Sequence, residues 1–326
     1  MYKTKTMFFI TMVFGTLLTM CSNSWIGMWM GLEINLMSFI PMIKNKMKMS
    51  AEAVMIYFMV QSISSTVLMF SIIMKTIYPS TNMTFTIIMM MSLLTKMGAA
   101  PFHMWLPEMM SKMNWNTNIL LMTWQKLGPM IMISNIQINN NIMSMMIIMS
   151  ITMGAIGGLN QTSLKKIMAF SSINHMGWMM SMIKIQNNWM MYLIIYSMMI
   201  SSTCMMFYKY NMLYIAQINM MNLSYSEKIS YMTSMLSLGG LPPFIGFLPK
   251  WISIQTLIMN ESYFMMIIMM MFSIITLFYY MRTMSMIIMN HSTINKWINV
   301  KSSTKIINMT LFINFSLPMV FMLNMI

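Results

Sequence analysis

The stretch MTFTIIMMMSLLTKMGAAPFHMWLPE, residues 83–108, places a lysine inside a long apolar run. If this run crosses a bilayer, Lys96 lies near the midplane, where a charged side chain costs roughly 2.5–3.5 kcal/mol on insertion scales. Gly98 is a weak helix former and Pro101 cannot donate a backbone hydrogen bond, so we expect the helix to break beside the lysine. A buried lysine next to a broken helix indicates an ion path through a membrane.

The whole chain has the composition of a membrane protein. Its 326 residues are 58% hydrophobic and only 7% charged, whereas about 25% charged residues is usual for a soluble domain. Apolar runs of about 20 residues, separated by short polar breaks, predict an all-α polytopic membrane protein with about eleven transmembrane helices. We place these spans at 6–21, 25–43, 52–74, 83–109, 118–136, 142–158, 164–183, 189–208, 230–259, 262–282 and 305–323. Residues 283–304 are expected to form a loop with room for a surface helix.

The distribution of loop charges fits this arrangement. With the spans alternating in direction, nearly all loop cations fall on the side of the N-terminus, and only Lys75 and Lys184 fall on the other. Such a bias is typical of the positive-inside rule. We therefore expect the N-terminus on the inner side and the C-terminus on the outer side. The net charge of +14 then reflects topology and not a nucleic-acid surface, because the cations are scattered over short loops.

A second interruption repeats the first. LGGLPPFIG, residues 238–246, precedes Lys250 in the ninth span, five spans after the break near Lys96. An odd number of spans reverses direction, and paired interrupted helices are typical of inverted-repeat transporters. We expect a single transmembrane domain over 1–326, with two inverted five-helix repeats at about 6–136 and 142–282 and a C-terminal helix at about 305–323. The alternative is that Gly and Pro are simply frequent in membrane helices.

Five titratable side chains inside the spans are candidates for the ion path: Glu33, Lys96, Lys126, Lys250 and His175. A lysine near a span end usually extends to the interface. That explanation suits Lys96 and Lys126 poorly, because each has about two apolar turns on both sides. Glu33 lies halfway along its span and needs a cation or a proton. His175 has polar neighbours on its own span and is the better relay candidate of the histidines.

Motifs for redox or nucleotide chemistry are missing from the sequence. Gly154, Gly157 and Gly158 lack the spacing of a dinucleotide fingerprint, and there is no phosphate-binding Gly-rich loop. Cys21 and Cys204 stand far apart without a CxxC pair, so iron–sulfur and zinc sites are not expected. We expect no cofactor and no metal bound by this chain, so that a gradient or partner proteins must drive any transport.

Several motifs together resemble a known family. They are GLEINL (31–36), KMGAAPFHMWLPE (96–108), TWQKLGP (123–129), GGLNQTSLKK (157–166), SSINHMGW (171–178) and GGLPPFIGFLPKW (239–251). In this order they are similar to the antiporter-like subunits of the membrane arm of respiratory complex I, which are related to subunits of cation/proton antiporters. The resemblance implies that Glu33 pairs with Lys96, that Lys126 lies on a central axis, and that Lys250 exchanges protons with the outer side. His175 also matches a family position.

The same resemblance implies a proton-translocating subunit of the NADH:ubiquinone oxidoreductase in the mitochondrial inner membrane. The N-terminus would lie in the matrix and the C-terminus in the intermembrane space. NADH, FMN, iron–sulfur clusters and ubiquinone would be bound by partner subunits. The expected partners are neighbouring antiporter-like and small membrane-arm subunits and membrane lipids, and not nucleic acid. The 61 methionines, the single Arg282 and the lack of Asp fit an AT-rich genome with the animal mitochondrial code.

Two other functions stay open at this point. A stand-alone cation/proton antiporter would exchange cations without a redox partner, and its discriminating feature would be paired intramembrane Asp residues. A structural scaffold of the membrane arm would tolerate replacement of Lys96, Lys126 and Lys250 by Met.

Overall fold

The computed structural model describes residues 2–44, 48–78, 82–136, 140–185, 188–220, 223–289 and 304–318. In these ranges the chain is helical, with an isolated β-bridge between Ser163 and Tyr214 and no strand. The predicted all-α class is confirmed. The chain divides into two compact units, Met1–Met146 and Ile147–Ile326.

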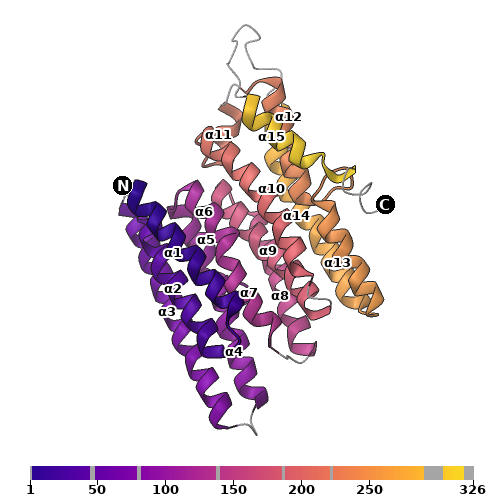
Figure 1. Cartoon of the computed structure of the whole chain (residues 1–326). Helices are drawn as coiled ribbons and strands as arrows, with labels where there is room; N and C mark the ends of the chain where they lie inside the picture. The colour runs from indigo at the N-terminus through magenta and orange to yellow at the C-terminus, as the bar shows by residue number, and fades with distance from the viewer. Residues whose placement is uncertain are drawn as a thin grey trace. The chain divides into compact units, whose positions relative to one another are not determined.

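The first unit is built on a layer of three long helices, α1 to α3, which run side by side (Figure 1). The backbones of α1 and α2 lie so close that a Cβ atom on Gly31 would be 2.8 Å from the carbonyl oxygen of Gly15. Small residues such as glycine allow this close approach between membrane helices. The helices described in this unit are α1 (Tyr2–Cys21), α2 (Trp25–Ile43), α3 (Lys48–Ile77), α4 (Asn82–Met97), α5 (Trp105–Lys112), α6 (Trp115–Met122), the 3₁₀ turn η2 (Trp124–Lys126) and α7 (Leu127–Ser134).

In the second unit, α12 is the central element. It packs against α10, α14 and α15, and its buried face carries serine and threonine side chains. The helices described are α8 (Asn140–Leu159), which begins in the first unit, α9 (Leu164–Ile185), α10 (Trp189–Lys209), α11 (Ile215–Met220), α12 (Tyr225–Gly239), α13 (Phe247–Met259), α14 (Tyr263–Met289) and α15 (Thr304–Asn314).

The first predicted break lies where the sequence places it. α4 ends at Met97, and Gly98 follows with a φ of +69°. The N–H of Gly98 donates to the carbonyl of Thr95 (3.2 Å), and the N–H of Ala99 donates to that of Leu94 (3.0 Å). This pair of hydrogen bonds is a Schellman motif, for which glycine is favoured because it adopts a positive φ without strain.

The second predicted break has the same geometry. α12 ends at Gly239, and Gly240 has a φ of +77°. Its N–H donates to the carbonyl of Ser237 (3.0 Å), and the N–H of Leu241 donates to that of Leu236 (3.3 Å). Both interrupted helices therefore end in a Schellman motif, and the chain resumes a helix at Trp105 in the first case and at Phe247 in the second.

Some expected boundaries were wrong. The expected fifth span, 118–136, begins earlier, at Trp115, and is interrupted by η2. The expected tenth span ends at Arg282, but the corresponding helix, α14, continues to Met289. The first part of the expected loop 283–304 is therefore helical. The short helix α11 was not expected. Residues 290–303 and 319–323 lie outside the described part of the chain.

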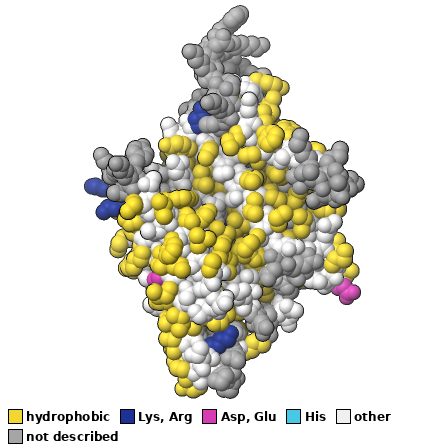
Figure 2. Space-filling view, viewed as in Figure 1, with side chains coloured by type: hydrophobic (Ala, Val, Ile, Leu, Met, Phe, Trp, Pro, Cys, Tyr) yellow, Lys and Arg dark blue, Asp and Glu magenta, His cyan; other side chains and the backbone are white. Residues whose placement is uncertain are grey.

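The surface has the character expected in lipid. By length and composition, α2, α3, α8, α10 and α14 are each able to cross a membrane, and shorter apolar helices span Lys5–Cys21 and Met83–Met97. Large apolar side chains are exposed, among them Ile63, Ile274 and Phe278 at 64% each, and on the face shown in Figure 2 hydrophobic side chains are widespread while charged ones are few. Serine, threonine and lysine side chains are instead found among the buried residues, as expected where polar groups need partners inside a helix bundle.

Candidate functional site

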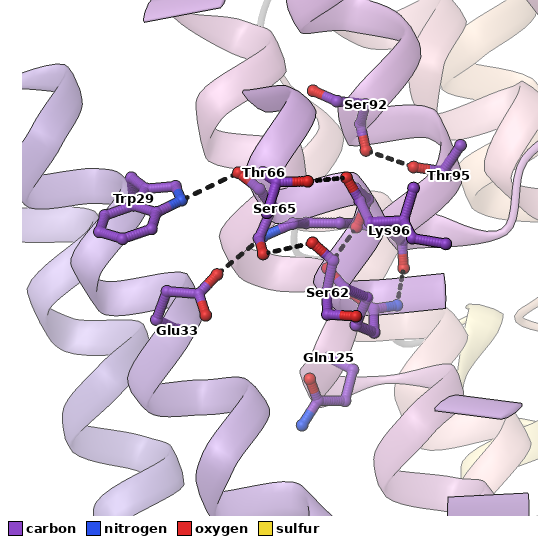
Figure 3. A network of polar contacts seen from close by, with 12 residues as sticks. Trp29, Glu33, Ser62, Ser65, Thr66, Ser92, Thr95, Lys96 and Gln125 are labelled. Atoms are coloured by element: carbon purple, nitrogen blue, oxygen red, sulfur yellow. Dashed lines mark hydrogen bonds and ion pairs between the residues drawn. The ribbon is translucent and has the colours of Figure 1, made fainter. Parts of the chain in front are cut away.

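The structure brings Glu33 and Lys96 together. Glu33 lies on α2 and Lys96 in the last turn of α4, and the Lys96 Nζ is 3.8 Å from the Glu33 Oε1. The lysine side chain is 3% exposed and the glutamate side chain 23%. Figure 3 shows Lys96 crossing toward Glu33 past the Ser62 and Ser65 side chains of α3. A carboxylate at this distance favours the charged form of a buried lysine, whereas burial favours the neutral form.

The break exposes backbone carbonyls at the end of α4, and side chains bind them. The Gln61 Nε2 donates to the carbonyl of Lys96 (3.1 Å), and the Trp105 Nε1 donates to that of Thr95 (3.1 Å). The last carbonyls of a helix lack intrahelical partners. These two contacts therefore fix the helix end that carries Lys96.

Lys96 and Lys126 line the same small cavity. Its volume is about 20 Å³, and its polar lining also includes Asn35, Gln61 and Gln125. A volume of about 10–15 Å³ is enough for one water molecule when polar partners are present. The cavity can therefore hold a water next to both lysine residues. Lys126 is 2% exposed and sits at the end of the 3₁₀ turn that interrupts this span.

Gln125 positions that turn. Its Nε2 donates to the Asn35 Oδ1 (2.9 Å), and its Oε1 accepts from the Tyr57 hydroxyl (3.4 Å). Sequence reasoning did not single out Asn35, Tyr57 or Gln125. The sequence carries a signal for two of them, because Asn35 follows Glu33 by two residues and Gln125 directly precedes Lys126. Nothing in the sequence shows that Asn35 and Gln125 contact each other.

Lys250 occupies the second broken helix. It lies in the first turn of α13 and is 5% exposed. Its Nζ donates to the carbonyl of Gly239 at the end of α12 (2.8 Å) and lies 5.8 Å from the centre of the Trp178 ring. The lysine thus spans the break and binds a backbone group that the break frees.

His175 is buried on α9 with a polar partner. Its Nδ1 is 2.8 Å from the Tyr192 hydroxyl of α10, and the histidine is 2% exposed. Ser171, Ser172 and Asn174 of the same helix are also buried. The predicted polar neighbourhood of His175 is therefore present, and it includes tyrosines that sequence reasoning missed.

A charged cluster outside these sites has a structural role. Glu227 forms a capping box with Ser224 at the start of α12, accepts a hydrogen bond from the Tyr210 hydroxyl, and lies 3.7 Å from the Lys209 Nζ. Burial raises the pKa of Glu227, but the hydrogen bonds from Tyr210 and Ser224 and the charge of Lys209 outweigh it and leave the pKa below its usual value. The cluster joins the end of α10 to the start of α12.

Comparisons with known proteins decide the family. Residues 22–276 match the family described as NADH:quinone oxidoreductase/Mrp antiporter, transmembrane. The chain belongs to this family. It is 42% identical to NADH-ubiquinone oxidoreductase chain 2 of Anopheles gambiae over 318 residues, 94% of this chain and 93% of that one. It is 44% identical to the chain of the same name from Locusta migratoria over 311 residues, 93% of this chain and 91% of that one.

A solved structure shares the fold of this chain. A chain of respiratory complex I from Thermus thermophilus with bound aureothin superposes with a TM-score of 0.80 at 17% identity, covering 87% of this chain and 70% of that chain. At this identity the likeness is one of fold.

Proposed function

We propose that this chain is a membrane-arm subunit of respiratory complex I in the mitochondrial inner membrane. There it translocates protons, driven by electron transfer from NADH to ubiquinone in partner subunits. Family membership and near full-length similarity to two insect chains named NADH-ubiquinone oxidoreductase chain 2 support the assignment. The observation that carries it is the ion pair of the buried Lys96 with the partly exposed Glu33, beside a cavity that Lys126 also lines.

The pair works as an electrostatic switch. Burial favours the neutral amine of Lys96, and the nearby carboxylate of Glu33 favours the ammonium ion. When Glu33 is neutralised, or when its carboxylate is drawn away from Lys96, an N–H bond of Lys96 breaks and the proton passes to water in the cavity. That water in turn gives a proton to the neutral amine of Lys126, where a new N–H bond forms. The coupling between quinone chemistry and this site is then a coupling free energy between distant sites.

We propose about eleven membrane spans in two inverted repeats, with the N-terminus in the matrix and the C-terminus in the intermembrane space. Lys250 exchanges protons with the intermembrane side, and His175 is a relay. NADH, FMN, iron–sulfur clusters and ubiquinone are bound by partner subunits, among which the neighbouring antiporter-like and small membrane-arm subunits contact this chain.

Replacing Lys96 by methionine tests the proposal. Lys96→Met keeps most of the length of the side chain but removes the titratable amine, so we expect the proton-to-electron ratio of the assembled complex to fall while NADH oxidation continues. The matched control is Lys75→Met. Lys75 lies in the last turn of α3, 5.5 Å from the Trp25 ring centre, and its loss should leave the ratio unchanged. A wild-type ratio in assembled Lys96→Met would overturn the proposal.

A second measurement separates the stand-alone antiporter. The purified chain, reconstituted in liposomes without partner subunits, should not exchange sodium for protons across the membrane. Exchange at a rate that Lys96→Met abolishes would favour the antiporter.

A further inference from the structure

Asn314 is a buried amide at the end of α15. It is the last residue of that helix and is 0% exposed. Neither its Oδ1 nor its Nδ2 has a hydrogen-bond partner among the described residues. Leaving a buried polar group unsatisfied costs about 1–3 kcal/mol, and native proteins usually satisfy such a group with ordered water. Leucine has the same branched shape and would carry no such cost, so the amide points to a bound water.

The amide faces the interior of the second unit. Ile307, Thr310 and Asn314 are all buried, and their spacing of three and four residues places them on one stripe of the helix. Met309 and Phe312, which lie off this stripe, are 64% and 70% exposed. Because α15 packs against α10 and α12, the stripe lies against these two helices. The Thr310 hydroxyl is satisfied within α15, where it donates to the Ile307 carbonyl (2.8 Å).

The end of α15 rests on the second break. The N–H of Ile245 donates to the carbonyl of Asn314 (3.1 Å), and the Phe244 and Phe315 rings lie 5.5 Å apart between centres. Ile245 belongs to residues 240–246, which join α12 to α13. We call residues 240–246 the break segment. The C-terminal helix therefore contacts the irregular backbone that the Schellman glycine Gly240 begins.

The break segment has more backbone acceptors than donors. Pro242 and Pro243 have no N–H, whereas every residue of the segment keeps its carbonyl. Irregular backbone at membrane depth is tolerated only where it is buried in protein or lines a water-filled cavity. The Nδ2 of Asn314 is a donor, and so is a water bound to its amide. The unsatisfied amide thus lies beside backbone that needs donors.

The break segment also sets the position of Lys250. Its last residue, Gly246, packs directly on α12, because a Cβ atom there would overlap the carbonyl of Ser237. The helix α13 begins at the next residue, Phe247. Lys250 lies in its first turn and donates to the carbonyl of Gly239 (2.8 Å). A shift of the segment would therefore move the lysine amine relative to the carbonyl that it binds.

We propose that Asn314 is a positioning residue for Lys250. Its carbonyl accepts from the Ile245 N–H, and its amide holds an ordered water that donates to carbonyls of the break segment. Together these contacts keep the segment in place while Lys250 gains and loses its proton. Asn314 itself exchanges no proton. This inference rests on the function proposed above, in which Lys250 takes part in translocation.

Two substitutions separate hydrogen bonding from packing. Asn314→Leu keeps the branched shape and loses the amide, whereas Asn314→Ser keeps a hydrogen-bonding group and loses volume. We expect the proton-to-electron ratio of the assembled complex to fall in Asn314→Leu toward its value in Lys250→Met, and to stay closer to wild type in Asn314→Ser. A packing role gives the opposite order, because a cavity is then the larger defect. The opposite order, or equal ratios, overturns the proposal.

Thr310→Val is the matched control. Thr310 is 1% exposed and lies one turn before Asn314 on the same stripe. Its hydroxyl is already satisfied within the helix, so the variant should assemble and show the wild-type ratio. A ratio as low as that of Asn314→Leu would mean that any polar loss from this stripe has the same effect, and it would overturn the specific role of Asn314.

The outcomes separate this inference from the proposed function. If Lys96→Met lowers the ratio and Asn314→Leu does not, the positioning role is overturned and the proposed function stands. If neither lowers it, both are overturned. A density map of the wild-type complex gives a test that does not depend on folding of a variant. Ordered water bonded to the Asn314 amide and to a carbonyl of the break segment supports the role. A dry amide, or one bonded to a partner subunit, overturns it.

Discussion

At the scale of single residues, the Glu33–Lys96 pair is asymmetric. Lys96 is enclosed, whereas Glu33 also lines an open groove of about 300 Å³ together with Phe8, Thr11, Ile34, Met37 and Ser38. The Glu33 Oε1 makes no hydrogen bond to the described residues, and its ion pair with Lys96 is long, at 3.8 Å. The carboxylate is therefore loosely held and open to charges outside the unit. We infer that signals from partner subunits reach Lys96 through Glu33.

Glu33→Gln should uncouple the switch while keeping its shape. The amide is neutral, so the buried Lys96 loses its counter-charge, and a buried charge left without a partner is strongly unfavourable. We expect Lys96 to lose its proton instead, and the proton-to-electron ratio of the assembled complex to fall. The control is Glu52→Gln, which removes the exposed ion pair with Lys112 (2.9 Å, Glu52 61% exposed). Such surface pairs contribute little. Equal ratios in the two variants would contradict the switch.

At the scale of helices, the two breaks share a cap but use it differently. In α4 the lysine precedes the Schellman glycine, and its own carbonyl is bound by Gln61. In the second break the lysine follows the glycine and returns to bind the carbonyl of Gly239. The freed helix end is thus bound by a glutamine amide in one case and by a lysine amine in the other. We expect Lys250 to move whenever its proton leaves, because a neutral amine binds that carbonyl less strongly.

Gly240→Ala tests the second cap. The positive φ at this position costs a residue other than glycine about 1–2 kcal/mol, and the new Cβ would lie 2.7 Å from the Lys250 Cδ and 2.8 Å from its Nζ. We expect lower thermal stability of the complex and a lower proton-to-electron ratio, because Lys250 must leave the Gly239 carbonyl. The adjacent Gly239→Ala is the control, since its Cβ would meet nothing closer than the Leu277 Cδ1 at 3.5 Å. Similar effects of the two changes would show that the cap does not position Lys250.

The breaks were predictable because their cause is local. Gly98 and Pro101, like Gly240 and Pro242, set the backbone by themselves. The end of α14 was not predictable in this way. Arg282 looked like the end of a span, but its guanidinium donates to the carbonyls of Leu159, the last residue of α8, and Gln161, just beyond that helix. Its charge has partners in the fold, and the helix continues past it.

The candidate site was predictable only in part, for a related reason. An isolated lysine or glutamate in an apolar run is visible in the sequence because its burial is costly. A tyrosine in such a run is not, since its ring suits a membrane helix as well as phenylalanine does. Tyr192 and Tyr280 are far apart in the sequence and meet only in the fold. The same holds for Asn35 and Gln125, whose hydrogen bond joins α2 to η2.

At the scale of the whole molecule, the two native cysteines report the orientation in the membrane. Cys21 is the last residue of α1 and is exposed, whereas Cys204 is buried within α10. If the N-terminus lies in the matrix, α1 crosses outward and Cys21 reaches the intermembrane side. This orientation is the one that the bias of lysines toward one set of loops predicts, and the cysteines test it without any added tag.

Labelling of mitoplasts with a membrane-impermeant maleimide checks this orientation. In mitoplasts the outer face of the inner membrane is accessible and the matrix is not. We expect Cys21 to react and Cys204 to stay unlabelled until the chain is unfolded, because a side chain at 0% exposure offers no access to the reagent. Cys21→Ser should abolish the signal from the folded chain. Labelling of Cys21 only in inverted inner-membrane vesicles would place the N-terminus in the intermembrane space. The matrix-facing lysines and the direction assigned to Lys250 would then both be reversed.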